Sequence, residues 1–184
     1  MIKVIGICGK KFNGKDTIAD HIVKNYGYTK ISLGDPIKHA LKEIFCFTDE
    51  QLWGSKKEIV DHYWNITPRE LMQYFGTNCF RDKFGSDYPQ IGDNIWVLVL
   101  RRKIQKLIEE GITKIIVPDL RFPNEEAVIR EFNGTVIRVI RTSININDIH
   151  VSENLSEQIN SDYVIYNDNI EQLYIDTDNI MYKI

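Results

Sequence analysis

Residues 2–17, IKVIGICGKKFNGKDT, join an apolar run to a loop that contains Gly9 and Gly14. A short apolar run bounded by glycine is typical of a buried strand. After the loop, apolar residues recur every three to four positions through residue 26, which predicts a helix. Asp16 falls in the first turn of that helix, where the helix dipole favours negative charge. The segment therefore predicts a strand, a glycine loop and a helix in direct succession.

The loop has the composition of a phosphate-binding loop. Glycines at Gly9 and Gly14 let successive backbone N–H groups turn toward an anion at close range, and Lys15 adds a positive charge at the start of a helix. The spacing follows the Walker A pattern G-x-x-x-x-G-K-[ST], except that Asp16 replaces the hydroxyl residue and Thr17 follows it. We expect Asp16 and Thr17 to lie near magnesium, partly through water. The alternative is a glycine turn without a ligand.

The composition is that of an ordinary globular protein. The 184 residues are 43% hydrophobic, which suffices for one domain with a core, and the net charge is −3. The charge is uneven, because residues 142–184 carry eight acids against Lys183 alone, which leaves the first 141 residues at +4. So weak an asymmetry suits a small anionic ligand better than a nucleic acid, which would need a clustered basic face. The three cysteines have no metal-binding spacing, and no apolar run reaches the ~18 residues of a membrane span. We expect a cytoplasmic protein that binds small molecules, without nucleic acid or membrane partners.

Strand and helix patterns alternate along the rest of the chain. Apolar runs predict further strands over residues 28–33, 113–117, 135–141 and 162–166. Helices are predicted over residues 36–45, 67–76, 95–110 and 124–132 and after residue 169. Five strands that alternate with helices, with neither repeats nor a linker, predict one α/β domain with a doubly wound parallel sheet. Ligands bind at the carboxyl ends of such strands, where Asp119 and Arg121 fall.

Three segments lack this regularity. Residues 48–66 mix aromatic and charged side chains and are expected to form a loop with a short helix. Residues 77–94 are expected to form a polar loop, which contains Arg81. Residues 142–158 are polar, as expected for a lid that opens and closes. The region over about 34–110 would then be a helical substrate-binding part within the single domain of residues 1–184.

Five motifs occur in order along the chain. They are GKDT at 14–17, DPIK at 35–38, TPRELMQYFGT at 67–77, D-x-R-F-P-N-E at 119–125 and H-x-S-E at 150–153. With these motifs the chain resembles the deoxynucleoside monophosphate kinases of bacteriophages and large DNA viruses over almost its whole length. The resemblance implies a P-loop nucleoside monophosphate kinase-like, three-layer fold with a five-stranded parallel sheet, a helical substrate-binding insertion and a lid. It also implies transfer of the ATP γ-phosphoryl group to a deoxynucleoside 5′-monophosphate with Mg²⁺, and it suggests a homodimer.

The same resemblance assigns roles to single residues. The ATP phosphates would be held by Lys11, Gly14, Lys15, Asp16 and Thr17. The monophosphate would be bound by Lys38, Arg69 and Arg81, with Trp96 beside the base or sugar and Asp119, Arg121 and Glu125 lining the site. The expected catalytic residues are Lys15, Arg121 and Arg141, of which Arg141 would touch the transferring phosphoryl group. Phosphoryl transfer relies on such converging cations.

Plainer interpretations of the same residues stay open. Arg69 and Arg121 could be surface ion-pair partners, Trp96 could belong to the core, and Asp119 could cap the helix that follows it. The loop could also serve another small-molecule kinase, such as a phosphomevalonate or dephospho-coenzyme A kinase, or a non-catalytic nucleotide-binding module. Such a module would not need a second anion site, which Lys38 and Arg69 would supply, so a kinase is favoured.

Overall fold

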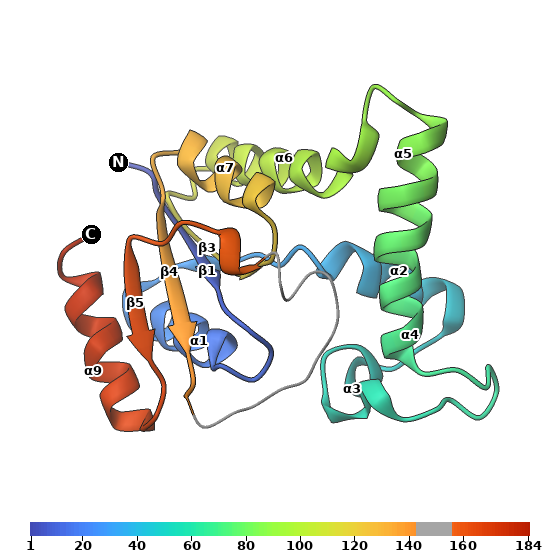
Figure 1. The fold of residues 1–184 in the computed structure, drawn as a ribbon, viewed down its shortest axis with the longest axis horizontal. Helices are drawn as coiled ribbons and strands as arrows, with labels where there is room; N and C mark the ends of the chain where they lie inside the picture. Colours follow the sequence, from blue (N-terminus) through green and yellow to red (C-terminus); the bar gives the residue numbers. More distant parts are fainter. Residues whose placement is uncertain (143–155) are drawn as a thin grey trace. The chain divides into compact units, whose positions relative to one another are not determined.

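The computed structural model describes residues 1–142 and 156–184, and the chain divides into two compact units (Figure 1). The first, here called the sheet unit, comprises Met1–Ser32 and Val99–Ile184. The second, the helical unit, comprises Leu33–Leu98. Each unit has its own cluster of buried apolar side chains.

Five parallel strands form the centre of the sheet unit. They are β1 (Lys3–Cys8), β2 (Thr29–Lys30), β3 (Lys114–Leu120), β4 (Thr135–Ile140) and β5 (Tyr163–Tyr166). Their order across the sheet is β2-β3-β1-β4-β5, and all neighbouring pairs are parallel. Because β1 lies between β3 and β4, the crossovers change direction beside it, which is where α/β sheets bind ligands. The phosphate loop begins at this place, directly after Cys8.

Helices cover both faces of this sheet. Helices α1 (Lys15–Tyr26) and α9 (Ile170–Met181) pack on one face, and α7 (Pro123–Glu131) packs on the other (Figure 1). The alternation of side chains along β1 explains the division. Ile5 and Ile7 point into the cluster with α1 and α9, whereas a Cβ on Gly6 would lie 3.0 Å from Ile129 of α7. The result is a three-layer α/β unit.

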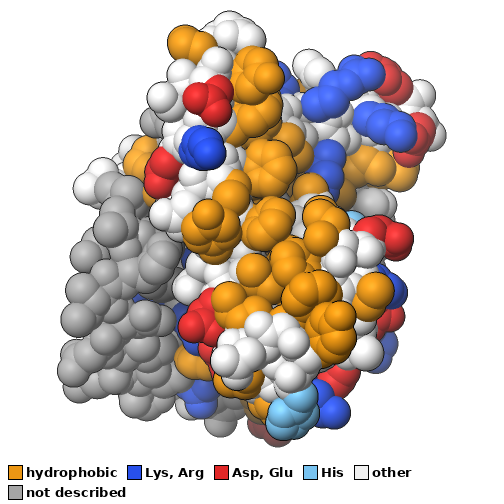
Figure 2. All heavy atoms as spheres, turned by 90° about the vertical axis from the view of Figure 1, so that its right-hand side faces the viewer, with side chains coloured by type: hydrophobic (Ala, Val, Ile, Leu, Met, Phe, Trp, Pro, Cys, Tyr) orange, Lys and Arg blue, Asp and Glu red, His pale blue; other side chains and the backbone are white. Residues whose placement is uncertain are grey.

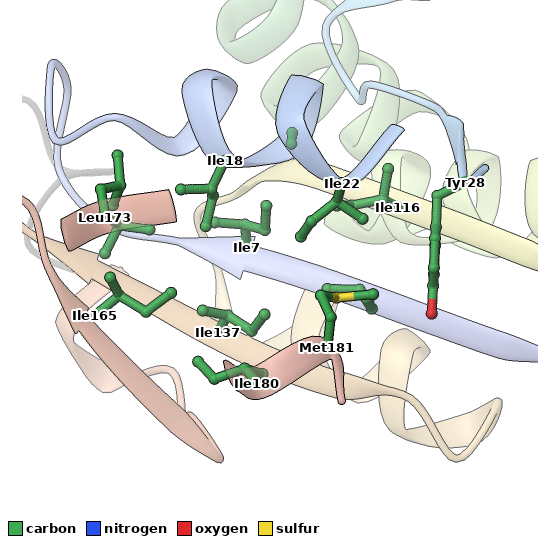
Figure 3. Packing of buried hydrophobic residues seen from close by; sticks show 13 residues of the cluster. Ile7, Ile18, Ile22, Tyr28, Ile116, Ile137, Ile165, Leu173, Ile180 and Met181 are labelled. Carbon is green, nitrogen blue, oxygen red and sulfur yellow. The ribbon is translucent and has the colours of Figure 1, made fainter. Parts of the chain in front are cut away.

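The core of the sheet unit is built mainly from isoleucines. Ile7, Ile18 and Ile137 are fully buried and pack together with side chains of α9 (Figure 3). Burying one such side chain stabilises the fold by about 1.5–3 kcal/mol. Because α1 contributes Ile18 and Ile22 to this core, the start of α1, which carries the end of the phosphate loop, is fixed against the sheet.

The helical unit is a set of short helices. They are α2 (Asp35–Phe45), α3 (Asp49–Leu52), the 3-10 helix η1 (Ser55–Glu58), α4 (Pro68–Gln73), the π-helix η2 (Tyr74–Lys83), α5 (Phe84–Asp87) and the 3-10 helix η3 (Gly92–Asn94). Leu41, Phe47, Leu52 and Leu71 form its core. Helix α4 begins as the sequence predicts, because Thr67 Oγ1 accepts a hydrogen bond from the Glu70 N–H at 3.1 Å.

The prediction of a polar loop over residues 77–94 is wrong for the first part of that range. The backbone stays helical from Pro68 to Asp87, with the wide turns of a π-helix in the middle. Gly76 does not end the helix, because the indole N–H of Trp96 donates to its carbonyl oxygen at 2.8 Å. The ring of Phe80 meets that of Trp96 at 5.7 Å between centroids. Aromatic packing thus overrides the turn signal of the glycine.

Apolar side chains also gather on the surface of the helical unit (Figure 2). Tyr63 is 84% exposed, and its ring meets that of Trp64 edge-on, with 4.8 Å between their centroids. Trp64 in turn meets Phe45, and its indole N–H donates to the Phe45 carbonyl oxygen at 2.9 Å. The aromatic network therefore continues from the core to the surface of this unit.

The predicted five-stranded parallel sheet is confirmed, and the differences are local. Strand β2 covers only Thr29–Lys30 instead of residues 28–33, and Asp119 lies inside β3 and not after it. Helix α6 (Ile95–Glu109) ends before Gly111, as predicted, and the boundary between the two units falls within it. Most of the expected lid, residues 143–155, lies outside the described residues; Ser156–Gln158 form the 3-10 helix η4.

Candidate active site

The phosphate loop between β1 and α1 takes its shape from two glycines with positive φ. Gly9 has φ +139° and Gly14 has φ +97°, values that residues with a side chain rarely adopt. A Cβ on Gly9 would lie 2.3 Å from the Val139 carbonyl oxygen, and one on Gly14 would lie 2.3 Å from Asn167 Nδ2. Both glycines therefore let the loop backbone lie directly against the ends of β4 and β5.

Three lysines lie on this loop or at its end. Lys15 begins α1, and its Nζ donates to the carbonyl oxygen of Lys10 at 2.8 Å, so its ammonium group folds back over the loop. The Lys10 ammonium pairs with Glu157 at 2.7 Å, and this hydrogen bond lowers the pKa of the Glu157 carboxyl. Lys11 Nζ lies 4.9 Å from the centroid of the Phe12 ring. A phosphate on the loop would meet a positive environment.

A pocket of about 260 Å³ opens beside the loop. Its lining comes from the loop, the end of β4 and η4: Gly9, Lys10, Asn13, Arg138, Val139, Ile140, Arg141, Ser156 and Glu157. Arg138 is held in place, because its guanidinium donates to the carbonyl oxygens of Ser156 at 3.1 Å and Ile159 at 2.5 Å. Arg141 is exposed at the rim. A ligand with its phosphates on the loop has room here for another part of its structure.

Asp16 and Thr17 occupy the first turn of α1. The Asp16 carboxylate is 81% exposed and lies 3.3 Å from Lys30 Nζ, which also contacts Asp20 at 2.8 Å. Burial lowers the pKa of Lys30, but the hydrogen bond and charge of the two aspartates outweigh it and raise that pKa. Lys30 therefore stays charged and offsets the negative charge of Asp16 beside the loop. Thr17 is half-buried.

The thiol of Cys8 lies at the end of β1, immediately before the loop, and is fully buried. Burial raises the pKa of Cys8, and the charges of Arg138 and Lys15 lower it by less. The group is therefore a neutral thiol at neutral pH, and a packing role follows from its burial.

The end of β3 carries Asp119, Arg121 and Glu125. Asp119 Oδ2 accepts a hydrogen bond from Ser32 Oγ at 2.5 Å. Glu125 is only 3% exposed, and its Oε2 accepts from the backbone N–H groups of Arg121 at 2.8 Å and Phe122 at 3.2 Å. Glu125 thus caps the start of α7, a role for which the sequence had also suggested Asp119. The Arg121 side chain is exposed.

In the helical unit, Lys38 lies in a small polar cluster. Its Nζ contacts Asp35 Oδ1 at 3.3 Å and lies 5.4 Å from the centroid of the Trp53 ring. The Trp53 indole N–H donates to the same Asp35 oxygen at 3.0 Å. The Lys38 side chain is 17% exposed. Asp35 and Trp53 therefore restrict the position of this ammonium group.

Arg69 and Arg81 lie along the long helical segment of the helical unit, and Trp96 lies in the first turn of α6. Arg69 Nε donates to Glu58 Oε1 at 3.1 Å, and its side chain is 28% exposed. Arg81 is half-buried in η2. Trp96 is 8% exposed, with its N–H on the Gly76 carbonyl, so its indole is part of the packing of this unit.

The sequence alone assigned no role to several residues that shape these sites. They are Asn13, Lys30, Glu58, Arg138 and Asn167. Asn13 and Asn167 are 154 residues apart, yet they hydrogen-bond to each other. Asn167 could have been noticed as a polar residue directly after a strand. Lys30 could have been noticed as a lysine in the strand that follows a helix with acids at Asp16 and Asp20.

No group of three or more His, Cys, Asp or Glu side chains that could hold a metal ion occurs in residues 1–142 and 156–184. A magnesium ion would therefore take few protein ligands here, and Mg²⁺ in phosphoryl-transfer sites usually takes its other ligands from phosphates and water. In the same part of the chain, no helix is long and apolar enough to cross a membrane.

Comparison with known proteins identifies the family. The family model "Deoxynucleotide monophosphate kinase" matches residues 3–57 and 46–176. The chain belongs to the deoxynucleotide monophosphate kinase family. It is therefore an ATP-dependent phosphotransferase of the nucleotide kinase class, and the resemblance found in the sequence is confirmed.

Two viral relatives match along nearly their whole lengths. A protein of Acanthamoeba polyphaga mimivirus, provisionally named a deoxynucleotide monophosphate kinase, is 35% identical over 177 residues, which are 93% of this chain and 92% of the relative. The deoxynucleotide monophosphate kinase of Enterobacteria phage T4 is 26% identical, covering 94% of this chain and 96% of the relative.

Solved structures agree on the fold. A dephospho-CoA kinase from Campylobacter jejuni has a TM-score of 0.52 at 14% identity and covers 100% of this chain and 98% of its own. TT1252 from Thermus thermophilus has a TM-score of 0.51 at 15% identity, with the same coverage. These likenesses support the kinase-like α/β fold and say nothing about the acceptor.

Proposed function

We propose that this kinase transfers the γ-phosphoryl group of ATP to a deoxynucleoside 5′-monophosphate, which gives ADP and the deoxynucleoside diphosphate. The observation that carries the proposal is that the sheet unit holds a phosphate loop with Lys15 and the helical unit holds cations of its own, Lys38 and Arg69. Family membership and the names of the mimivirus and T4 relatives support the same acceptor class.

The sheet unit supplies the donor site in this proposal. Backbone N–H groups of the loop around Gly14 bind the β- and γ-phosphates, and Lys15 Nζ exchanges its contact with the Lys10 carbonyl for phosphate oxygens. Lys11 adds charge at the loop, and Arg121 and Arg141 stabilise the charge that develops on the transferring group. The pocket beside the loop, with Arg138 in its wall, receives the rest of the nucleotide.

The helical unit supplies the acceptor site. Lys38, Arg69 and Arg81 bind the monophosphate, and the planar guanidinium of Arg69 suits two phosphate oxygens at once. Asp119 and Glu125 of the sheet unit are also proposed as substrate-binding residues, with Glu125 acting by holding the backbone at Arg121. Trp96 acts through packing, because its indole N–H is engaged by Gly76 and its ring is buried.

Asp16 and Thr17 carry oxygen atoms of the kind that bind magnesium. Thr17 offers a hydroxyl oxygen and Asp16 an exposed carboxylate, and both are hard oxygen ligands of the type Mg²⁺ prefers. Because Lys30 pairs with Asp16, we propose that Asp16 acts through water and Thr17 directly. When bound, the ion would neutralise charge on the β- and γ-phosphate oxygens.

A coupled assay for ADP tests the proposal. Purified protein is given ATP and Mg²⁺ with each of the four common deoxynucleoside monophosphates, and turnover is expected with at least one. Dephospho-coenzyme A and phosphomevalonate serve as acceptor controls and should give none. Absence of turnover with all four deoxynucleoside monophosphates would refute the proposal.

Equilibrium binding separates a kinase from a module that only binds nucleotide. A kinase should bind its monophosphate without ATP, because the cations of the helical unit do not belong to the phosphate loop. Calorimetric titration of a deoxynucleoside monophosphate into the nucleotide-free protein measures this directly. A protein that binds ATP and ignores every monophosphate contradicts the acceptor half of the proposal.

A further inference from the structure

Asn167 lies directly after β5, beneath the phosphate loop, and is 9% exposed. Its side-chain Nδ2 donates a hydrogen bond to the backbone carbonyl oxygen of Asn13 at 2.9 Å. Its own backbone N–H donates to the Ile140 carbonyl oxygen at 2.7 Å, which ties it to the end of β4. A residue 154 positions away in sequence thus holds one particular peptide group of the loop.

A second buried amide continues this connection. Asn13 is 7% exposed, and its side-chain Nδ2 donates to the carbonyl oxygen of Val139 at 2.9 Å. Its backbone N–H donates to the Lys10 carbonyl oxygen at 3.2 Å. In both side-chain contacts the partner is a carbonyl, which only accepts, so the NH₂ end of each amide must face it. Asn13 is therefore fixed at its backbone and its side chain.

The peptide held by Asn167 is the one that leads into Gly14. In a trans peptide the C=O and the following N–H point in opposite directions. Holding the Asn13 carbonyl on Asn167 therefore turns the Gly14 N–H away from Asn167. That N–H is one of the donors that the proposed function assigns to phosphate.

The packing around Gly14 adds a steric constraint to the hydrogen bond. A Cβ on Gly14 would lie 2.3 Å from Asn167 Nδ2 and 3.3 Å from its Cγ. The amide of Asn167 thus lies against the Gly14 Cα as well as on the carbonyl before it. A smaller side chain at position 167 would lose both the hydrogen bond to the Asn13 carbonyl oxygen and the packing against Gly14.

We propose that Asn167 is a positioning residue for ATP binding, one that sets the orientation of the Asn13–Gly14 peptide so that the loop is ready for phosphate. The proposal rests on the donor half of the proposed function. It predicts that a side chain at position 167 that cannot donate to the Asn13 carbonyl oxygen weakens binding of the triphosphate part of ATP. Asn167 itself need not touch the nucleotide. Preorganised donors bind anions without a cost of rearrangement.

Asn167→Asp is the sharpest variant, because it keeps the shape and replaces the donor with a carboxylate. At pH 8 the carboxylate would face the Asn13 carbonyl oxygen, and ATP affinity is expected to fall roughly tenfold or more. Burial raises the pKa of a carboxyl group. As pH falls toward 5, the protonated acid can donate its O–H to the same carbonyl, and the loss should shrink. A role in folding alone would not give recovery of affinity with acid.

Asn169→Asp is the matched control. Asn169 lies two residues further on, is exposed, and caps α9 through its side-chain oxygen, which accepts from the Glu171 N–H at 2.8 Å. Aspartate caps a helix equally well, so this variant adds the same charge without losing a contact to the loop. Its ATP affinity should stay within twofold of that of the unaltered protein at both pH values.

The measurement is calorimetric titration of the full-length protein with ATP and, separately, with inorganic tripolyphosphate, which probes the loop without a base. Both ligands should lose affinity in Asn167→Asp at pH 8 and regain it toward pH 5. If Asn167→Asp fails to fold, Asn167→Ala replaces it, with an expected loss of about fivefold for both ligands. Equal affinities in the unaltered protein and the position-167 variant, or an equal loss in Asn169→Asp, would overturn the inference. If the unaltered protein binds no ATP, the proposed function itself fails.

Discussion

Lys15 and Arg69 are both proposed to bind phosphate, yet the protein holds them in different ways. Lys15 lies at the end of a loop whose backbone is fixed by Asn13 and Asn167, and its Nζ donates to the carbonyl oxygen of Lys10. Arg69 is paired with a carboxylate, that of Glu58. Lys38, in the same unit as Arg69, is likewise paired with Asp35.

This difference predicts different binding behaviour at the two sites. At the loop, an incoming phosphate meets backbone donors that Asn13 and Asn167 already hold in orientation. In the helical unit, an incoming phosphate competes with Glu58 and Asp35 for the same cations. Donor affinity should therefore depend on loop geometry, and acceptor affinity should depend on the charges of these two acids.

The largest expected effect comes from Lys15→Ala. The change removes a cation that is proposed to bind the β- and γ-phosphates, so kcat should fall by about 10²–10³-fold. Binding of the monophosphate should be nearly unchanged, because its cations lie in the other unit. Steady-state kinetics and monophosphate titration measure the two effects. Lys24→Ala, at the exposed end of the same helix, is the control; equal loss of turnover and monophosphate binding in Lys15→Ala would remove the assigned role.

Arg69→Lys tests the acceptor site and should have the next largest effect. The charge stays, but the planar fork that can bind two phosphate oxygens is lost. We expect kcat/KM for the monophosphate to fall by about tenfold, while KM for ATP stays within twofold. Arg102→Lys on the exposed side of α6 should change neither. A rise in the KM for ATP that equals the loss for the monophosphate would break the assignment of separate sites.

Glu58→Gln should act in the opposite direction. The carboxylate that pairs with Arg69 loses its charge, so the guanidinium is more available to an incoming phosphate. The pair is partly exposed, and such pairs contribute at most about 1 kcal/mol. The KM for the monophosphate should fall by roughly two- to threefold. Glu43→Gln, an exposed acid of α2 in the same unit, should leave it unchanged; a rise in KM would show that Glu58 mainly orients Arg69.

The same contrast explains what the sequence could predict. The strand, loop and helix around Gly14 follow from local patterns, because backbone geometry is set by neighbouring residues. The five-stranded sheet follows from apolar runs of the right length and spacing. By contrast, the Arg69–Glu58 pair and the Asn13–Asn167 bond join residues that are 11 and 154 positions apart. Neither spacing has a periodic signature, so only the folded chain reveals these partners.

The continuous helix through Gly76 was missed for a related reason. A glycine before a polar stretch is a local signal for the end of a helix. Here Trp96, which is 20 residues further on, bonds the Gly76 carbonyl and packs on Phe80. Tertiary contacts of this kind outweigh a preference of about 1 kcal/mol. Propensity alone could therefore not place Arg81 on a helix.

The smallest expected effect concerns the support of α1, the helix that carries Lys15. Asp178 on α9 accepts from the Tyr26 hydroxyl at 2.8 Å and pairs with His21 at 2.7 Å. Asp178→Asn should lower the free energy of unfolding by about 1 kcal/mol at pH 7, because the site is partly exposed. Chemical denaturation measures this, and Asp176→Asn on the same helix is the control.

The pH dependence of that variant tests the cause. Burial, followed by the hydrogen bond to Asp178, raises the pKa of Tyr26 from 10.0 to about 12. A raised pKa means that the stabilisation is complete below pH 10 and is lost as pH rises from about 10 to about 12. The free energy of unfolding should therefore fall less steeply over this range in Asp178→Asn than in the unaltered protein. ATP affinity at pH 7 should change less than twofold, because the loop is fixed by Asn13 and Asn167 and not by this contact. A larger loss of ATP affinity would show that the anchoring of α1, and not the loop itself, sets the geometry of the donor site.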